Sequence, residues 1–316
     1  MTIQRAFKVR LYPTTEQRVC LNKTLGSCRF LYNQMLAERI AIYQTLKDNR
    51  EALYAHTYKT EKEYKQEYGF LKEADAAALQ QARRNLEAAY ANFFTSLKGL
   101  RKGGTVGFPR FKSKHNHNDS YRTGMSIAVN FEGQTVKLPK ITDPLRFKHS
   151  VNVKSWYQTA KLKNITISIS PTGTYYASCL FEGEQDFKGF QEKTEKVIGL
   201  DMSLRDFYVD NLGNTPEYRR VYRNSEKRLG KYQRRLSRKP KDSRNQQKAR
   251  LKVAGIHERT ANYHRNFIDT LSYKLVKDYD VIVVENLLLK GMSQALNLGK
   301  SVMDLGYGAF LEKLRY

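Results

Sequence analysis

The spacing of apolar residues divides the first third of the chain into a strand and a helical segment. Residues 5–12 alternate between apolar and polar and predict a strand, and the capping sequence at 14–17 predicts that a helix begins there. Apolar residues then recur every three to five positions along 21–43 and again along 75–97. These two stripes predict helices with buried faces. The glycine-rich stretch 99–107 predicts the end of the helical segment.

After this stretch the apolar period changes to two. The alternating runs are separated by glycine-containing turns and predict strands at 125–129, 135–138, 165–169 and 175–180. They predict a small antiparallel sheet or barrel. Since one strand precedes the helices and the others follow them, the simplest architecture is a β domain with a helical insertion.

Two apolar runs in the last third of the chain each end in a carboxylate. Residues 197–201 end in Asp201, and the β-branched run 279–285 ends in Glu285. The second run is typical of a strand buried on both faces. Helices between the two strands favour a mixed α/β sheet with both acids at one edge, where hard oxygen ligands can hold Mg²⁺ for phosphodiester cleavage. The alternative is that both acids merely end strands or cap helices.

Charge is distributed unevenly along the chain. The formal net charge is +25, and residues 218–265 contain 17 Lys or Arg against 3 Asp or Glu, a net +14 over 48 positions. Pro240 predicts a break there and Ser243 a new helix start, so this stretch should form a helical hairpin. Such charge indicates nucleic acid as the partner, with acidic membrane or a solvated surface as alternatives. No run reaches the roughly 18 apolar residues of a spanning helix, and 1–13 lacks a signal-peptide pattern, so we expect a cytoplasmic protein.

Two groups of basic residues are candidates for binding nucleic acid. The hairpin group comprises Arg219, Arg220, Arg223, Lys227, Arg228, Lys231, Arg234, Arg235 and Arg259. The second group, Arg110, Lys112 and Lys114, alternates with aromatic residues that either anchor the segment or fill the core. His115 and His117 follow; a polar surface loop explains them better than a metal site.

Cysteine usage excludes two classes of small scaffold. The three cysteines, Cys20, Cys28 and Cys179, include no Cys-x-x-Cys pair. Neither a disulfide framework nor a zinc ribbon can therefore be built from them, and no zinc is expected.

Several motifs together resemble the TnpB (OrfB) family of transposon-encoded RNA-guided nucleases, which is related to the type V CRISPR effectors. They occur in the family's order at residues 7–14, 28–33, 107–114, 198–203, 256–262 and 282–287. Several motifs in order are far more specific than any one of them.

The resemblance implies a multidomain α+β protein. A β-barrel wedge domain would comprise 1–14 and 99–192, a helical recognition insertion 15–98, and an RNase H-like (RuvC) α/β domain with the basic hairpin 193–316. It further implies a guide RNA from the transposon end, double-stranded target DNA and Mg²⁺-dependent cutting. Asp201 and Glu285 fall on the family's catalytic aspartate and glutamate.

The sequence departs from the family's pattern after 307–316. Family members continue into a further strand, a zinc ribbon and a third catalytic aspartate, so we expect an incomplete RuvC-like domain, weak Mg²⁺ binding and deficient cleavage by the chain as written. Three causes of this departure are open: an interrupted gene copy, an incomplete sequence, or a retained binding function without cleavage. The alternatives to a nuclease are a non-cutting RNA-guided DNA-binding regulator and a generic basic RNA-binding protein.

Overall fold

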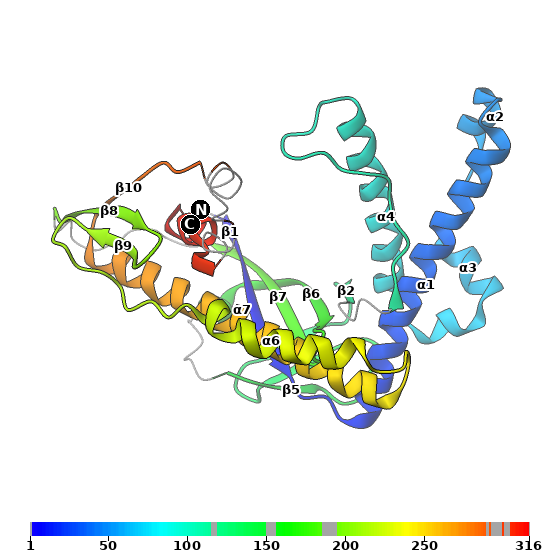
Figure 1. The fold of residues 1–316 in the computed structure, drawn as a ribbon. Coiled ribbons are helices and arrows are strands. Elements are labelled where there is room, and N and C mark those ends of the chain that lie inside the picture. Colours follow the sequence, from blue (N-terminus) through cyan, green and yellow to red (C-terminus); the bar gives the residue numbers. More distant parts are fainter. Residues whose placement is uncertain are drawn as a thin grey trace. The chain divides into compact units, whose positions relative to one another are not determined.

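The chain folds into two compact units, residues 1–186 and 187–316 (Figure 1). The structure is a computed structural model. It describes residues 2–114, 119–149, 156–184, 195–288, 291, 299 and 304–315. None of the helices in these ranges combines the length and apolar character needed to cross a membrane.

The first unit begins with a strand, continues through helices and ends in further strands. Strand β1 (Thr2–Leu11) is followed by α1 (Thr15–Leu46), α2 (Arg50–Ala55), α3 (Glu61–Glu67), the 3₁₀ helix η1 (Gly69–Glu73) and α4 (Ala76–Leu97). The later elements are β2 (Ser120–Thr123), β3 (Ala128–Asn130), β4 (Thr135–Lys137), β5 (Leu145–Lys148), α5 (Trp156–Thr159), β6 (Lys161–Ile169) and β7 (Tyr175–Glu184). Strands β2 and β5 and the short helices between α1 and α4 have no counterpart in the sequence-based prediction.

The strands form one antiparallel sheet in the order β2-β6-β7-β1-β5-β4-β3. Strand β1 pairs with β7 along its whole length, from Thr2 opposite Glu184 to Leu11 opposite Tyr175. Its pairing with β5 involves only Arg10 and Leu11. The described strands therefore pair as an open sheet with β2 and β3 at its edges, which agrees with the first of the two predicted forms, a sheet or a barrel.

Helix α1 begins where the capping sequence predicted. The Thr14 hydroxyl accepts a hydrogen bond from the Gln17 N–H at 3.3 Å, and the Gln17 side chain accepts one from the Thr14 N–H at 3.0 Å. Two otherwise unpaired backbone donors are thereby satisfied. The apolar stripes of α1 and α4 supply the core, but its outer limit was predicted wrongly: Tyr43 and Leu97, near the far ends of the two helices, are exposed because the described residues do not cover them.

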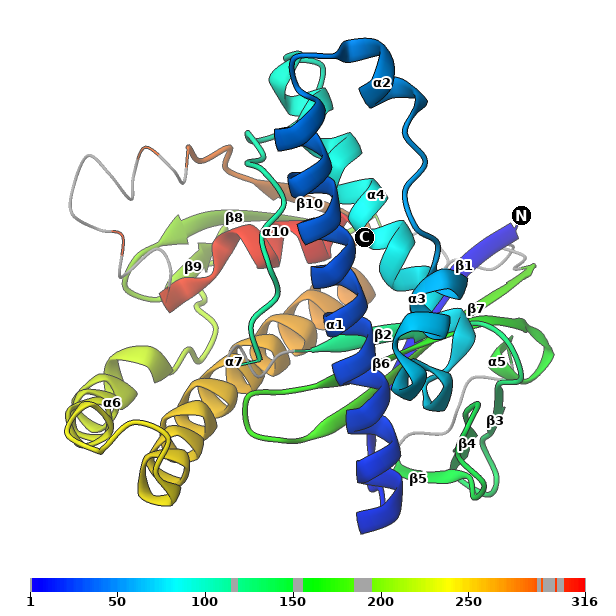
Figure 2. The same ribbon diagram turned by 90° about the vertical axis from the view of Figure 1, so that its right-hand side faces the viewer.

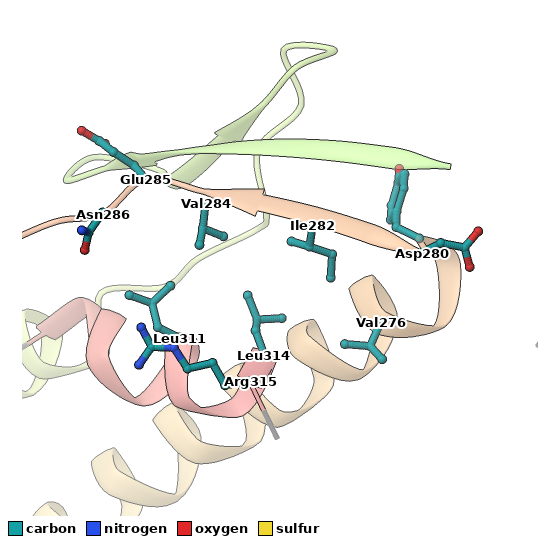
Figure 3. A pocket seen from close by; sticks show the side chains of 10 residues that line it. Val276, Asp280, Ile282, Val284, Glu285, Asn286, Leu311, Leu314 and Arg315 are labelled. Carbon is teal, nitrogen blue, oxygen red and sulfur yellow. The ribbon is translucent and has the colours of Figure 1, made fainter. Parts of the chain in front are cut away.

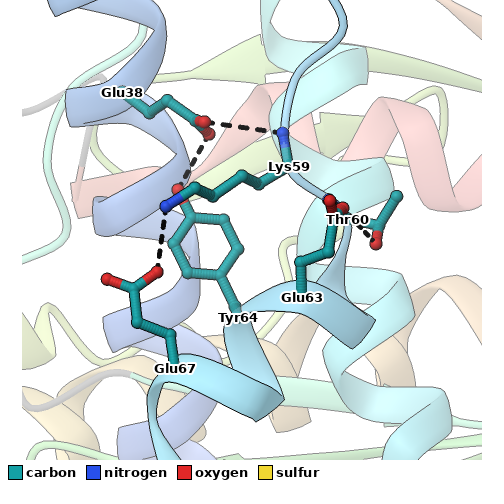
Figure 4. Close-up of polar contacts among 6 residues, drawn as sticks. All are labelled: Glu38, Lys59, Thr60, Glu63, Tyr64 and Glu67. Atoms are coloured by element: carbon teal, nitrogen blue, oxygen red, sulfur yellow. Dashed lines mark hydrogen bonds and ion pairs between the residues drawn. The ribbon is translucent and has the colours of Figure 1, made fainter.

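A polar cluster holds the connection after α2 against α1 (Figure 4). The buried Tyr64 side chain of α3 donates its hydroxyl hydrogen to Glu38 at 2.8 Å. The Lys59 ammonium pairs with Glu67 at 3.0 Å. Desolvation, followed by the bond to Glu38, raises the pKa of Tyr64, so the hydroxyl remains a donor over the physiological range.

The second unit is a three-stranded sheet packed against long helices. Its elements are β8 (Val197–Ser203), β9 (Phe207–Asp210), α6 (Val221–Ser237), α7 (Arg244–Asp278), β10 (Val281–Val284) and α10 (Tyr307–Arg315). Strand β8 is central, parallel to β10 and antiparallel to β9. Helices α6 and α7 form the predicted hairpin (Figure 2), and the Ser243 hydroxyl caps α7 by accepting from the Gln246 N–H at 3.0 Å.

The described residues of the unit cover only one face of this sheet. Alternate residues of β8 and β10 pack with α7 and α10 around the buried Phe207. On the other face Val197, Val281 and Val283 are 56%, 49% and 57% exposed. The prediction that β10 is buried on both faces was therefore wrong, because the described helices of this unit pack against one side alone.

Candidate functional site

Asp201 and Glu285 are brought together by the parallel pairing of β8 and β10. The paired residues run from Val281 beside Val197 to Val284 beside Leu200. Asp201 and Glu285 are the next residues on the two strands. Since side chains alternate across a strand, both lie on the exposed face, opposite the buried Leu200. The sequence-based prediction that the two acids share one edge agrees with this register.

Both carboxylates line one open cavity of about 500 Å³. Asp210 of β9 also lines it, but its carboxylate is held in a turn, accepting from the N–H groups of Leu212 at 2.9 Å and Asn214 at 2.7 Å. Partial desolvation raises the pKa of Asp210, but these hydrogen bonds outweigh it and hold the pKa below its usual value. Asp210 is thus a charged residue whose oxygens already have partners.

The residues at this cavity fit a magnesium ion held by two side chains. Mg²⁺ binds oxygen ligands and commonly retains several waters while contacting one or two carboxylates. Among the residues that the structure describes, no group of three or more His, Cys, Asp or Glu side chains is arranged to hold a metal. Asp201 and Glu285 are thus two neighbouring carboxylates at one open cavity.

The opposite side of β10 is apolar and faces α10 (Figure 3). Ile282 and Val284 point toward Leu311 and Leu314 across a cavity of about 600 Å³, whereas the Glu285 carboxylate points away from the helix. The packed face thus fixes the strand, and the acids are left accessible on the other face.

Most of the predicted basic residues of the hairpin project from its surface. Leu229 is the buried residue of α6, and the exposed ones are Arg223, Lys227, Arg228, Lys231, Arg234, Arg235 and, on α7, Arg259. Arg228 and Arg235 lie beside the Tyr232 ring, 5.9 and 5.8 Å from its centroid. Helix α6 therefore presents a strongly basic surface, with the Tyr232 ring between two of its arginines.

Two predicted contacts at the start of the hairpin have partners within the unit. Arg220 donates from one guanidinium nitrogen to the carbonyl oxygens of Leu204 at 2.9 Å and Arg205 at 3.2 Å. Arg219 lies 3.8 Å from Glu217, and both side chains are exposed. Arg220 thus ties the hairpin to the turn after β8, an arrangement that charge counting does not reveal.

In the first unit the segment around Arg110 is anchored to the helices. Asn33 of α1 donates to the Lys112 carbonyl at 2.9 Å and accepts from the Lys112 N–H at 2.8 Å, and the Lys112 ammonium lies 4.4 Å from the centroid of the buried Tyr32 ring. The Phe108 ring contacts aromatic rings of α4.

All three basic residues of the segment, Arg110, Lys112 and Lys114, are exposed, and the Lys112 ammonium is directed at an aromatic ring. His115 and His117 lie outside the described residues.

A buried aspartate in the second unit has no counterpart among the predicted site residues. Asp304 is 3% exposed and contacts both the start of α6 and His264 of α7. No local motif marks it, because its partners Tyr218, Tyr222 and His264 are 40 or more positions away along the chain.

Comparison with known protein families matches two parts of the chain. A family model described as a helix-turn-helix domain of the OrfB/IS605 group covers residues 1–48, and one described as "Probable transposase" covers 184–296. In the structure the first stretch consists of β1 and the single long helix α1.

Curated relatives match nearly the whole chain. A Streptomyces pristinaespiralis protein described as "Putative RNA-guided DNA endonuclease" is 30% identical over 316 residues, covering 99% of this chain and 74% of that protein. The Escherichia coli K12 protein described as "Putative RNA-guided DNA endonuclease InsQ" is 29% identical over 329 residues, covering 99% and 77%. The "Virulence protein VsdF" of Salmonella dublin is 39% identical over 118 residues, 35% of this chain and 94% of its own length. The chain therefore belongs to the TnpB (OrfB) family of transposon-associated proteins.

Proposed function

We propose that this protein is an RNA-guided DNA endonuclease that takes its guide RNA from the transposon end and acts on double-stranded DNA. The names of two relatives that match 99% of the chain support this function. The observation that carries the proposal is the register of β8 and β10, which places Asp201 beside Glu285 on an open face. The same unit contains the basic hairpin, so phosphate-binding and acidic groups occur in one folded unit.

The domain organisation we propose has three parts. The wedge domain comprises 1–14 and 99–192, the helical recognition insertion 15–98, and the RuvC-like domain 193–316. The pairing of β1 with β7 across the intervening helices supports the first division. The parallel pair β8 and β10, joined through the helical hairpin and flanked by antiparallel β9, supports an RNase H-like fold for the last part.

In this proposal Asp201 and Glu285 hold Mg²⁺, which polarises the scissile phosphate and activates the attacking water when bound. The two carboxylates supply fixed oxygen ligands, since Asp201 lies within β8 and Glu285 directly follows β10, and both strands are held by their neighbours. The exposed arginines and lysines of α6 neutralise backbone phosphates.

The test begins with the RNA that accompanies the purified protein. Sequencing should recover one discrete RNA encoded beside the protein's own gene. Guide-matched duplex DNA is then incubated with the complex and Mg²⁺. Asp201→Ala and Glu285→Ala should each reduce the cleavage rate by about 100-fold or more, because they remove metal ligands. Asp278→Ala, which deletes an exposed carboxylate before the other end of β10, should cleave at the wild-type rate.

Two other outcomes distinguish the remaining functions. Guide-dependent DNA binding without cleavage would identify a non-cutting regulator. One observation favours this second candidate: within the described ranges only two carboxylates with free oxygens meet at the cavity, so ion placement depends on few ligands. Random cellular RNA on the purified protein, with no effect of Asp201→Ala, would instead identify a generic RNA-binding protein.

A further inference from the structure

A buried polar network surrounds Asp304 in the second unit. One oxygen of its carboxylate, Oδ1, accepts from the Tyr222 N–H at 3.1 Å and lies 3.6 Å from Nε2 of His264. The Tyr218 hydroxyl donates to the Asp304 carbonyl oxygen and is 3.1 Å from the same His264 nitrogen. Three segments that are distant in sequence, 218–222, His264 and Asp304, thus meet at one buried residue.

Asp304 provides the cap that α6 lacks locally. The residue at the N-cap position, Arg220, makes no capping hydrogen bond from its side chain. Tyr222 is the second residue of the helix, so its N–H has no partner within the helix. The Asp304 carboxylate accepts this bond, and its negative charge lies at the positive end of the helix dipole.

Two chains of contacts connect Asp304 with the end of β8 and the turn that follows it. The first passes through the start of α6, where Arg220 donates to the carbonyl oxygens of Leu204 and Arg205. The second passes through the start of α10, where the Tyr307 hydroxyl donates to the Ser203 carbonyl oxygen. Ser203 is two residues after Asp201 on the same strand.

The buried Asp304 carboxylate is not expected to stabilise the folded state by itself. The second oxygen of Asp304, Oδ2, is buried and has no hydrogen-bond partner among the residues that the structure describes. A buried carboxylate with an unpaired oxygen typically destabilises a protein relative to an apolar residue of similar volume. The carboxylate is therefore better explained by what it holds in place than by a contribution to stability.

We infer that Asp304 is a positioning residue for the acidic site: through Arg220 and Tyr307 it fixes the turn after β8 and hence the direction of the Asp201 carboxylate. The inference rests on the proposed function, since it requires Asp201 and Glu285 to bind a divalent ion. Residues that orient metal ligands typically change metal affinity by 10- to 100-fold when they are removed.

The test measures Mn²⁺ affinity by electron paramagnetic resonance, so that it does not depend on cleavage. Asp304→Ala should raise the Mn²⁺ Kd roughly tenfold. Tyr307→Phe, which deletes one hydroxyl and keeps the ring, should also raise the Kd. Asp304→Asn keeps an acceptor for the Tyr222 N–H and should restore most of the affinity lost in Asp304→Ala. Circular dichroism at the assay temperature ensures that each variant is folded.

Asp269→Ala is the matched control. Asp269 lines the same cavity of about 720 Å³ as Asp304, but its carboxylate pairs with the partly exposed Lys313 at 2.8 Å, near the far end of α10 from Tyr307. Its removal should leave the Kd unchanged.

Different results would refute the acidic site and the positioning role of Asp304. If Asp201→Ala binds Mn²⁺ as tightly as wild type, the acidic site itself is refuted. If Asp201→Ala loses binding while folded Tyr307→Phe and folded Asp304 variants keep the wild-type Kd, the positioning role is refuted and the site stands. A loss of affinity in Asp269→Ala equal to that in Asp304→Ala would also overturn the specific role of Asp304.

Discussion

At the scale of single residues, burial changes the chemistry of side chains that look alike in the sequence. Cys20, Cys28 and Cys179 are free cysteines, and only Cys20 is partly accessible. Burial raises the pKa of Cys28 and of Cys179 to about 12 in each case. The thiolate is the reactive form, so these two residues combine low access with a very low thiolate fraction at neutral pH.

Alkylation tests this difference. With iodoacetamide at pH 8, mass spectrometry of the native protein should show modification of Cys20 well before Cys28 and Cys179. In denaturant all three should react at similar rates, which serves as the control. Rapid labelling of Cys28 in the native protein would contradict its burial on the packed face of α1.

At the scale of elements, the structure shows how close contacts constrain the backbone. Gly306 precedes α10 with a φ of +67°, and a Cβ there would lie 3.3 Å from Nδ1 of His264. Gly255 lies within α7, where a Cβ would meet nothing within 4 Å. The same substitution should therefore have opposite effects at the two positions.

We expect Gly306→Ala to destabilise the second unit by about 1–2 kcal/mol, because a left-handed backbone is costly for a residue with a side chain. Gly255→Ala should stabilise it by about 1 kcal/mol, the gain of helix propensity from glycine to alanine. Urea unfolding of the two variants measures both free energies. A stabilising effect at Gly306 would contradict the turn geometry that leads into α10.

At the scale of the whole molecule, charge is segregated by sequence position. The net +14 of residues 218–265 lies largely on the exposed surface of the hairpin. If this surface neutralises phosphates, it should account for a large share of the salt dependence of nucleic-acid binding.

A triple alanine variant at Lys227, Lys231 and Arg234 should make the negative slope of log K against log salt concentration shallower by about 2 to 3, where K is the association constant for nucleic acid. A control variant at Lys47, Lys62 and Lys72 in the first unit changes the net charge equally and should alter the slope by less than about 1. Fluorescence anisotropy at several salt concentrations measures both. Equal slopes for the two variants would mean that the hairpin makes no specific contribution.

Much of the element structure was predictable, since local signals determine where helices and strands begin. The capping bonds of Thr14 and Ser243 form as predicted, and the apolar stripe of α1 is buried from Leu21 to Met35. The prediction failed where burial depends on a neighbour, as for Tyr43 and Val283. An apolar pattern indicates which side chains can be buried, but it does not indicate whether another element covers them.

The sequence by itself determined the family motifs, the acidic strand ends and the basic hairpin, because each depends on residues adjacent in the chain or on composition. Only the tertiary structure decided that Asp201 and Glu285 are neighbours in register, that Arg220 bonds to carbonyl oxygens, and that Asp304 joins three segments. These features depend on pairing between residues tens of positions apart. Hydrogen-bond geometry across such distances is set by the packing of whole elements, and no local pattern encodes it.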